Sequence, residues 1–470
     1  MRVIIGGAGR VGIALARALA SEKYDIVIVD NDSRAVTNAQ ALDCLVVNGN
    51  ITSRETLLEA GITHASVFVA ATPSDETNLI ACSIAEHAQE ASEGEDKLTS
   101  ICRLRTASYV DEFNQGHLLE WAKVDHVVNP LHGAIQRLNA GLRSTDIEEV
   151  IPFGEDAYVI EFDIGETAQN IVGRPLKDVK DDFVHAFPNI VGVKRDGERS
   201  FIPNDESVLQ VGDRLAVAVI GLDGFNPALI TFGHEISYFP EHPKVVIVGA
   251  SSIGTKMAKD WLAHGATVTV LERELHLANK LAGSKMGGDV NIEVIHGDHL
   301  DKSVLEEISI DGYDVALSAL ADDHANIAAV LMMSDLGVPH TGLMLYDADL
   351  VKVTQRMGIS FAVDRHRVAV NNILSHVHRS LSGHYALLAE LPNVVGITLK
   401  VTERAKFAGK RVSDAKFPEW MRPAFIKRRN IGGEWESISP QPDELLLEND
   451  RIVLFCMKEK VADAQKRFKV

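Results

Sequence analysis

The chain has 470 residues, of which 46% are hydrophobic and 24% are charged, and its formal net charge is −19. This length is enough for three or four domains, and the composition is that of a soluble globular protein. No stretch approaches the roughly 18 uncharged apolar residues that a membrane-spanning helix needs. The acidic charge excludes non-specific nucleic-acid binding, because a phosphate backbone attracts the opposite charge.

The four cysteines are scattered through the chain without CxxC spacing: Cys44, Cys82, Cys102 and Cys456. We therefore expect neither a disulfide scaffold nor a zinc knuckle, and the pattern fits a reducing cytoplasm. The first residues run directly into an apolar strand and a glycine-rich loop, so we expect no signal peptide before the fold.

Apolar runs alternate with amphipathic stretches over residues 1–145. The expected strands are 3–5, 26–29, 44–47, 67–70 and 100–104, and the expected helices are 11–20, 34–41, 78–88 and 131–143. This alternation predicts a doubly wound parallel sheet of the Rossmann type. The segment 91–97 is a polar insertion, for which we expect a solvated loop.

Residues 150–223 have a different character, with short runs rich in Val, Ile and Phe at 158–162, 190–194 and 214–220. Turn signals at 195–197 and 211–213 separate these runs, so we expect a small α+β domain with more strand than helix. The three prolines of segment 224–242 and its end predict a linker between two halves: Pro227, Pro240 and Pro243.

The second half repeats the order of the first, with expected strands at 245–248, 268–271, 292–295 and 315–319 and a small domain near 390–460. The offset is 242 residues both from Gly7 to Gly249 and from Asp30 to Glu272, and 248 residues from 75–78 to 323–326. A register kept over separated landmarks indicates a duplication. We expect four domains: 1–145, 146–226, 243–385 and 386–470.

The first half contains the pattern Gly7-x-Gly9-x-x-Gly12 between a strand and a helix, with Asp30 at the end of the next strand. This context is that of a dinucleotide-binding loop. Gly7 permits the tight turn, Gly9 lets a pyrophosphate approach the backbone, and Gly12 allows close packing of the helix. Asp30 is placed to bind ribose hydroxyls, and its charge should repel a 2′-phosphate, which favours NAD(H) or plain adenine nucleotides over NADP.

The second half has Ser251 where the middle glycine would stand, while Glu272 keeps the acidic position. A Cβ atom and a hydroxyl there crowd the closest approach of a pyrophosphate. Two interpretations stay open. The second half binds a smaller or differently posed nucleotide, or it is an empty structural repeat.

Further polar residues lie near the expected ligand edge of the first sheet. Thr72 and Pro73 follow a strand there. Asp75 and Asn78 are expected to cap the next helix, with contact to a ligand as the alternative. Arg103 is a candidate partner for phosphate or carboxylate, with a structural ion pair as the alternative. In the second half, the polar residues His296, Asp298 and His299 favour a turn over a metal site. No GxxxxGK[ST] loop supports P-loop nucleotide hydrolysis.

The motifs together resemble the tandem RCK (KTN) regulatory proteins of potassium transport, over nearly the whole length. In the first N-terminal domain, the matching stretches are 3–12, 26–30, 58–62, 69–72 and 75–78. In the small domain they are 171–176, 193–197 and 208–213. Two departures are Asn50 after Gly49, where such proteins often have Asp, and Ser251.

The resemblance implies a peripheral cytoplasmic regulatory subunit, without catalytic activity or a pore of its own, on the inner face of the cell membrane. It implies a homo-oligomeric ring, typically of four tandem chains, bound to a potassium-translocating membrane subunit of the TrkH or TrkG type. The implied cofactors are NAD(H) and ATP or ADP. Their contacts fall on Gly7, Ala8, Gly9, Arg10, Val11, Gly12, Asp30, Thr72, Pro73 and Arg103. The matching positions of the second half are Gly249, Ala250, Ser251, Ser252, Ile253 and Glu272.

Two other classes of protein are alternatives. An NAD-dependent oxidoreductase would need an acid–base residue beside the nicotinamide, and the first small domain offers only His185. A structural adaptor with vestigial Rossmann sites would bind no nucleotide.

Overall fold

The computed structural model of the chain describes residues 1–90, 97–183, 187–378, 381–405 and 407–468. The chain forms two compact units. The first comprises Met1–Pro130, His366–Leu388 and Pro392–Val470, and the second comprises Leu131–Arg365 and Ala389–Leu391. His185 and, except for Lys97, the expected loop at 91–97 lie outside the described residues.

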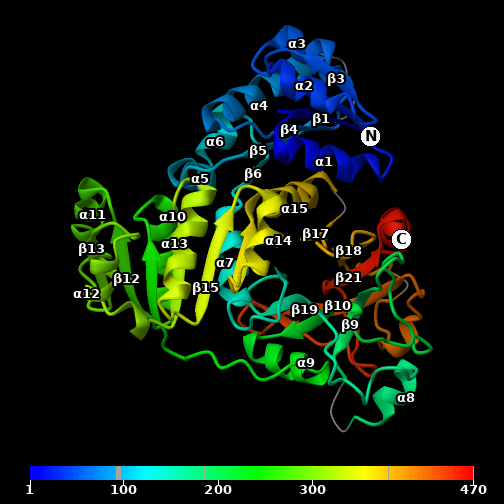
Figure 1. Ribbon diagram of the computed structural model, residues 1–470. Coiled ribbons are helices and arrows are strands. Elements are labelled where there is room, and N and C mark those ends of the chain that lie inside the picture. The colour runs from blue at the N-terminus through cyan, green and yellow to red at the C-terminus, as the bar shows by residue number, and fades with distance from the viewer. Residues whose placement is uncertain (91–96, 184–186, 379–380, 406, 469–470) are drawn as a thin grey trace. The chain divides into compact units, whose positions relative to one another are not determined.

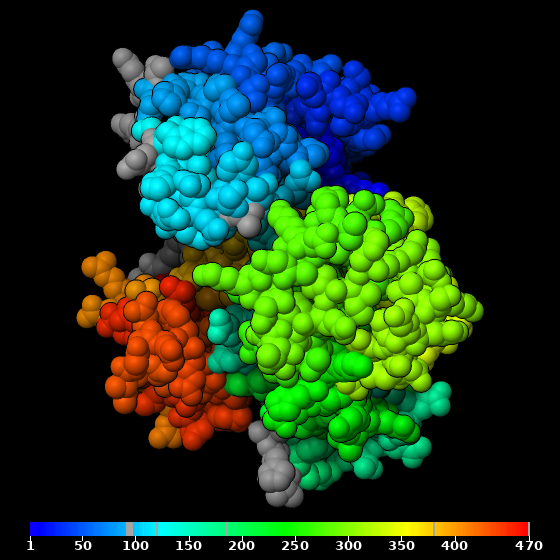
Figure 2. Space-filling model, turned by 90° about the vertical axis from the view of Figure 1, so that its left-hand side faces the viewer, coloured from blue at the N-terminus to red at the C-terminus, as the bar shows by residue number. Residues whose placement is uncertain are grey.

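The first unit contains a six-stranded parallel sheet with the order β3-β2-β1-β4-β5-β6. Its strands are β1 (Arg2–Gly6), β2 (Asp25–Asp30), β3 (Leu45–Asn48), β4 (Val67–Ala70), β5 (Thr99–Arg103) and β6 (His126–Val128). The helices between them are α1 (Arg10–Ala20), α2 (Ser33–Ala39), α3 (Arg54–Glu59), α4 (Asp75–Glu90), α5 (Ala107–Asn114) and α6 (His117–Trp121). This order confirms the predicted Rossmann-like sheet. In Figure 2 the residues of this sheet and its helices, blue to cyan, form one continuous surface.

The same unit contains an antiparallel sheet with the order β17-β18-β21-β19-β20. Its strands are β17 (Tyr385–Leu387), β18 (Val394–Lys400), β19 (Met421–Arg429), β20 (Trp435–Ile438) and β21 (Arg451–Met457). Helix α16 (Val461–Phe468) packs on β18 and β21, and helix α15 (Arg365–Val377) precedes this sheet in the sequence.

The second unit repeats both kinds of sheet. Its parallel sheet has the order β13-β12-β11-β14-β15-β16. The strands are β11 (Lys244–Val248), β12 (Thr267–Glu272), β13 (Ile292–His296), β14 (Val315–Ser318), β15 (His340–Leu345) and β16 (Phe361–Asp364). The helices are α7 (Leu131–Gly141), α10 (Ser252–Ala263), α11 (Leu275–Ala282), α12 (Lys302–Glu307), α13 (Asp323–Asp335) and α14 (Ala348–Arg356).

The antiparallel sheet of the second unit has the order β7-β8-β10-β9. It consists of β7 (Glu149–Pro152), β8 (Ala157–Asp163), β9 (Asn189–Lys194) and β10 (Arg214–Ile220), with helices α8 (Leu176–Asp181) and α9 (Phe225–Thr231). Helix α9 occupies the start of the segment expected to be a linker, because Phe225, Ala228 and Leu229 are buried on one of its faces.

Each parallel sheet receives its last helix from the other half of the chain. Helix α7 follows the first parallel sheet in sequence but packs on β15 and β16 in the second unit (Figure 1). Leu138 of α7 is fully buried, and a Cβ atom built on Gly342 of β15 would lie 2.9 Å from its Cδ1 atom. Conversely, Ile373 and Leu374 of α15 are fully buried in the core that also contains Ile5 of β1. The halves therefore exchange a helix in each direction.

A stacked pair of histidines lies where α15 meets the first parallel sheet. The rings of His126 and His376 are 4.3 Å apart between centroids, at an interplanar angle of 19°. Burial lowers the pKa of His376 to about 4, with a smaller contribution from the charge of His126. Burial also lowers the pKa of His126. Both rings are therefore neutral near pH 7.

The low pKa of His376 predicts an acid-sensitive first unit. The pKa of an unfolded histidine is near 6.5, so below that pH the unfolded chain binds a proton that the folded chain does not. This stability is fully present above pH 6.5 and is lost as the pH falls towards 4. About 2 kcal/mol should be lost between pH 7 and pH 5. His376→Leu should abolish this part of the pH dependence in urea unfolding, whereas the same change at the exposed His87 should retain it.

The exchanged helices predict which sheet loses local stability when one of these helices carries a packing defect. Leu138→Ala removes a buried side chain from α7 and should cost about 2–5 kcal/mol of local stability. Hydrogen exchange should then accelerate in β15 and β16, although the mutated residue follows β6 in sequence. The matched change Leu374→Ala should instead accelerate exchange in β1 and β5. Faster exchange only in the sheet that precedes each helix would contradict the exchange of helices.

Candidate nucleotide site

The glycine loop of the first unit is shaped by one close contact. Gly7 has a φ angle of +111°, which L-residues rarely adopt, and its amide donates to the carbonyl of Val29 at 2.8 Å. A Cβ atom on Gly12 would lie 1.9 Å from the carbonyl oxygen of Gly7. Only glycine fits at position 12, so the start of α1 packs directly on the loop as well as against the strand.

The middle glycine is open. Gly9 is exposed, and a Cβ atom built on it would meet no heavy atom within 4 Å. Gly9 is the N-cap of α1; it has no side chain to accept a hydrogen bond from the first turn, and that turn contains no acidic residue. The partial positive charge of the helix start is thus left for an external anion, as in a phosphate-binding loop.

Asp30 lies at the end of β2, beside this loop. Its Oδ2 atom accepts a hydrogen bond from the amide of Ala8 at 2.6 Å, and its Oδ1 atom accepts one from Asp32 at 2.8 Å. Each carboxylate oxygen has a second lone-pair direction that can accept a ribose hydroxyl. Asp30 therefore ties the loop to β2 in addition to its predicted contact with ribose.

Thr72 lies next to the loop on the other side. A Cβ atom on Gly7 would be 3.3 Å from the amide nitrogen and the Cγ2 atom of Thr72. The buried Asn78 fixes Thr72 by accepting hydrogen bonds from its amide at 2.9 Å and its hydroxyl at 2.7 Å. The predicted capping role of Asn78 is wrong. The Oγ atom of Ser74 accepts the hydrogen bond from Thr77 in the first turn of α4.

Asp75 also has a role other than the predicted cap. Its carboxylate accepts hydrogen bonds from the amides of Arg105 at 3.1 Å and Thr106 at 2.8 Å, and so holds the segment that follows β5. The guanidinium of Arg105 in turn donates to the carbonyl of Pro73. Arg105 was not among the predicted site residues, although its spacing of two residues from Arg103 was the available signal.

These residues meet at one edge of the sheet. Asp30, Gly7, Thr72 and Arg103 lie at the carboxyl ends of β2, β1, β4 and β5, which are neighbours in that order. The strand order reverses between β1 and β4, and ligands of open α/β sheets bind at such a switch point. Arg103 is mostly buried, and its main-chain carbonyl accepts from Asn78.

The remaining loop residues divide between core and surface. Ala8 and Val11 are buried, so a ligand can reach them only through the backbone, whereas Arg10 and Pro73 face the outside.

The corresponding loop of the second unit has the same backbone contacts but a different residue at its middle position. Gly249 has a φ angle of +100°, and a Cβ atom on Gly254 would lie 1.9 Å from the carbonyl oxygen of Gly249. The carboxylate of Glu272 accepts from the amide of Ala250 at 2.7 Å, as Asp30 does from Ala8. The contacts that shape the loop are therefore duplicated.

Ser251 fills the position that Gly9 leaves open. Its hydroxyl accepts from the amide of Gly254 at 3.3 Å, and donates to the carbonyl of Ala319 at 2.9 Å. The side chain thus caps α10 and bridges to the end of β14. A phosphate in this place would have to displace both hydrogen bonds.

The second unit also lacks the arginine of the first. Asp323 accepts hydrogen bonds from the amides of Tyr346 and Asp347. Asp75 makes the same contacts with Arg105 and Thr106, so Tyr346 corresponds to Arg105. Two residues earlier, Met344 therefore corresponds to Arg103. At the end of β13, a ring nitrogen of His296 bonds the carbonyl of Arg273 at 3.0 Å. The described residues contain no group of three or more His, Cys, Asp or Glu side chains that could hold a metal ion.

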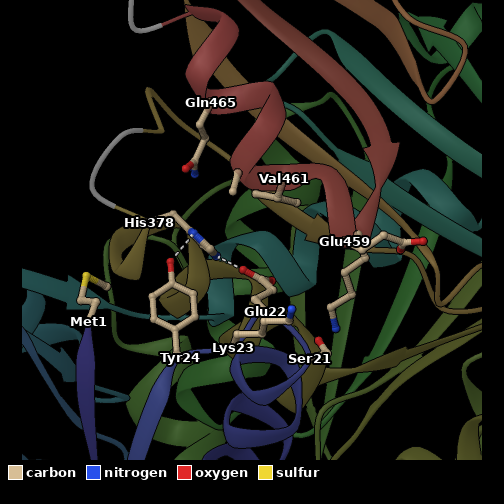
Figure 3. A pocket seen from close by; sticks show the side chains of 11 residues that line it. Met1, Ser21, Glu22, Lys23, Tyr24, His378, Glu459, Val461 and Gln465 are labelled. Carbon is tan, nitrogen blue, oxygen red and sulfur yellow. Dashed lines mark hydrogen bonds and ion pairs between the residues drawn. The ribbon is translucent and has the colours of Figure 1, made fainter.

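A cavity of about 480 Å³ lies elsewhere in the first unit, between the end of α1 and the start of α16 (Figure 3). Its polar groups bind one another. A carboxylate oxygen of Glu22 lies 3.1 Å from Nε2 of His378, and Glu22 accepts a hydrogen bond from Tyr385. The hydroxyl of Tyr24 bonds the other ring nitrogen of His378. Burial and the charge of Glu22 raise the pKa of Tyr24 to about 12. This network joins the parallel and antiparallel sheets of the unit and leaves the glycine loop as the candidate site.

The fold and site define a tandem protein in which a Rossmann-like domain and a small antiparallel domain each occur twice. The TrkA-N domain family matches residues 3–130 and 245–364, and the TrkA-C domain family matches residues 159–220 and 397–469. The chain belongs to this family of duplicated TrkA-N and TrkA-C domains.

Characterised relatives have the same full-length organisation. The "Trk system potassium uptake protein TrkA" of Azorhizobium caulinodans is 26% identical over 100% of this chain and 99% of its own length. The "Trk system potassium uptake protein TrkA homolog 1" of Methanosarcina mazei is 26% identical over 100% of both chains. Among solved structures, "GsuK channel bound to NAD" is similar in fold, with a TM-score of 0.52, 19% identity, and coverage of 99% of this chain and 78% of that one. Within the described residues, no helix is long and apolar enough to cross a membrane.

Substitution of the two loop glycines should affect stability very differently. Gly12→Ala places a Cβ atom against the backbone of Gly7 and should lower the free energy of unfolding by about 3 kcal/mol. Gly9→Ala adds a methyl group in open space at a φ angle of −71°, so stability should change by less than about 0.5 kcal/mol. Urea unfolding of both variants tests this. Equal destabilisation would contradict the loop geometry.

Proposed function

We propose that this chain is a nucleotide-sensing, non-catalytic regulatory subunit of a Trk-type potassium uptake system. The family supports the biological context, because full-length relatives are named as Trk system potassium uptake proteins. The observation that carries the sensing role is the open Gly9, with the uncapped helix start behind it and Asp30 beside it.

The ligand that fits this site is NAD(H). The open glycine allows a pyrophosphate to approach the start of α1, and Asp30 provides an acceptor for the adenosine ribose. Asp30 and the neighbouring Asp32 would repel a 2′-phosphate, which disfavours NADP. ATP or ADP could use the same helix start and the same carboxylate, so these nucleotides are competitors for one site. Binding uses Gly7, Gly9, Asp30, Thr72 and Arg103.

The second Rossmann unit serves as the structural counterpart of the first. The hydroxyl of Ser251 accepts the hydrogen bond of the Gly254 amide, which a phosphate would otherwise accept, and Met344 replaces the cation of Arg103. Of the two alternatives for this unit, these contacts support the empty repeat. The residues of 249–253 and Glu272 then maintain the loop without binding a ligand.

The regulated partner is a membrane potassium-translocating subunit of the TrkH or TrkG type. This chain binds to it on the cytoplasmic face of the membrane. A ring of four tandem chains would present four first-half sites. A ligand changes the balance between two ring states only through its different affinity for them, typically by about 1–3 kcal/mol. In a closed symmetric ring the sites act on the same equilibrium, so modest coupling at each is enough for a switch.

Calorimetry with NADH, ADP and ATP tests the binding site. The wild-type chain should bind one nucleotide per chain. Gly9→Val should weaken binding at least tenfold at unchanged stability, because two Cβ substituents block the pyrophosphate. Asp30→Ala should also weaken binding. No heat with any nucleotide would support a structural adaptor instead.

Two further measurements separate the remaining possibilities. Ser251→Gly is the matched variant, and a second bound nucleotide per chain is expected only in this variant. Two nucleotides bound to the wild-type chain would contradict the empty second site. Steady oxidation of NADH with a panel of ketones, or reduction of NAD with hydroxy acids, would overturn the regulatory role in favour of an oxidoreductase.

A further inference from the structure

Helix α1 connects the first glycine loop to parts of the second half of the chain. It begins at the loop and has 11 residues, so its two ends are about 16 Å apart. On its apolar face, Leu19 is fully buried in a core that also contains Ile373 and Leu374 of α15. The helix whose start is left for an anion therefore shares a core with an element that precedes the second small domain.

The last turn of α1 fixes the segment that follows it. The amides of Glu22 and Tyr24 donate to the carbonyl of Leu19 at 3.0 and 3.3 Å. The amide of Lys23 donates to the carbonyl of Ala20 at 3.0 Å, and Lys23 has a φ angle of +64°, a left-handed conformation common at helix ends. Glu22 and Tyr24 therefore keep their positions only while the last turn of α1 is formed.

Glu22 and Tyr24 point toward His378, which comes from the second half of the chain (Figure 3). A carboxylate oxygen of Glu22 lies 3.1 Å from Nε2 of His378, and the hydroxyl of Tyr24 lies 3.1 Å from Nδ1. Glu22 also accepts a hydrogen bond from Tyr385 of β17, whose ring stacks on that of His378 at 4.7 Å between centroids. The side chains of Glu22 and His378 are only 6% and 2% exposed. We call these four residues the α1 latch.

Two features make the α1 latch responsive to small movements of α1. Hydrogen bonds weaken steeply with distance and angle, and buried polar groups that lose their partners are destabilised, so a displaced latch loses its contacts together. The cavity of about 480 Å³ beside the latch is lined by Ser21, Lys23 and Gln465, among others, and can admit water to the separated groups. An open arrangement, in which water replaces the lost partners, is therefore accessible to this segment.

We propose that the α1 latch transmits nucleotide binding at the first glycine loop to the antiparallel domain formed by β17 to β21. This inference rests on the proposed function, because it takes the loop as the nucleotide site. A phosphate accepts hydrogen bonds from the first turn of α1, and helix formation is cooperative, so a bound phosphate also stabilises the last turn. The bound chain then favours the closed latch. By reciprocity, a closed latch strengthens nucleotide binding by the same factor.

Hydrogen exchange and calorimetry with NADH on the full chain test this coupling. In the wild type, saturating NADH should slow exchange in β17 and β18 as well as in α1. Tyr385→Phe removes only the buried hydroxyl that donates to Glu22. In this variant the slowing in β17 and β18 should be lost, the slowing at the start of α1 should remain, and NADH should bind about fivefold more weakly.

Tyr313→Phe is the matched control. Tyr313 is also buried, and its hydroxyl donates to Thr269 at 2.7 Å in the second unit. Its loss removes the same kind of hydrogen bond outside the α1 latch, so the NADH-dependent slowing and the affinity for NADH should equal those of the wild type. If the latch were only structural, Tyr385→Phe would lower stability but keep the wild-type response to NADH.

Tyr24→Phe provides a second test at a half-buried position and remains informative if Tyr385→Phe does not fold. It removes the hydroxyl that contacts His378 and should also abolish the slowing in β17 and β18. Slowing there that both variants retain, or slowing confined to the first parallel sheet in the wild type, would overturn the coupling while nucleotide binding stayed intact. No heat and no slowing with NADH, ADP or ATP would instead overturn the proposed function, and this inference with it.

Discussion

The contact between the carbonyl of Gly7 and the α-carbon of Gly12 determines how the rest of the site is built. It brings the start of α1 onto the loop, so that the backbone at Gly9 is the outermost part of the turn. Asp30 on one side and Thr72 on the other then fix the loop through hydrogen bonds to Ala8 and contacts with Gly7. The same contact in the second unit, between Gly249 and Gly254, produces the same frame. What distinguishes the two loops is the side chain at one position.

Because the chain is duplicated, the glycine loops of its two halves can be compared directly. With backbone geometry held constant, Gly9 leaves a helix start uncapped, while Ser251 caps it with a hydroxyl. A Gly cap costs only a few tenths of a kcal/mol of helix stability relative to a Ser cap, and a site that binds phosphate can tolerate that cost. The two halves therefore differ at the position over the helix start, and also at the neighbouring strand end, where Met344 replaces Arg103. The exchange of α7 and α15 ties the two halves of the chain together, since neither parallel sheet is complete without a helix from the other half.

Much of this could be predicted from sequence, for reasons that are local. The glycine pattern, Asp30 and the strands with continuous apolar runs each depend on neighbouring residues, and the expected strand at 67–70 matches β4. No strand was predicted at β6, β7, β15 or β16, and none of β17 to β21 was predicted individually within the second small domain. β6 and β16 have three and four residues, and β15 contains His340, Thr341 and Gly342, which weaken an apolar pattern. The destination of α7 could not be predicted, because periodicity shows that a helix has an apolar face but not which sheet will cover it. The roles of Asp75 and Asn78 also depend on partners about 30 residues away, where a capping prediction considers only the next turn.

The most direct measurement is potassium flux through the membrane subunit reconstituted in liposomes with this chain, with and without saturating NADH, ADP or ATP. If the open loop is a working sensor, at least one nucleotide will change the flux severalfold with the wild-type chain and will have no effect with Gly9→Val. Flux that is the same for both chains at every nucleotide concentration would contradict a sensing role for the first glycine loop.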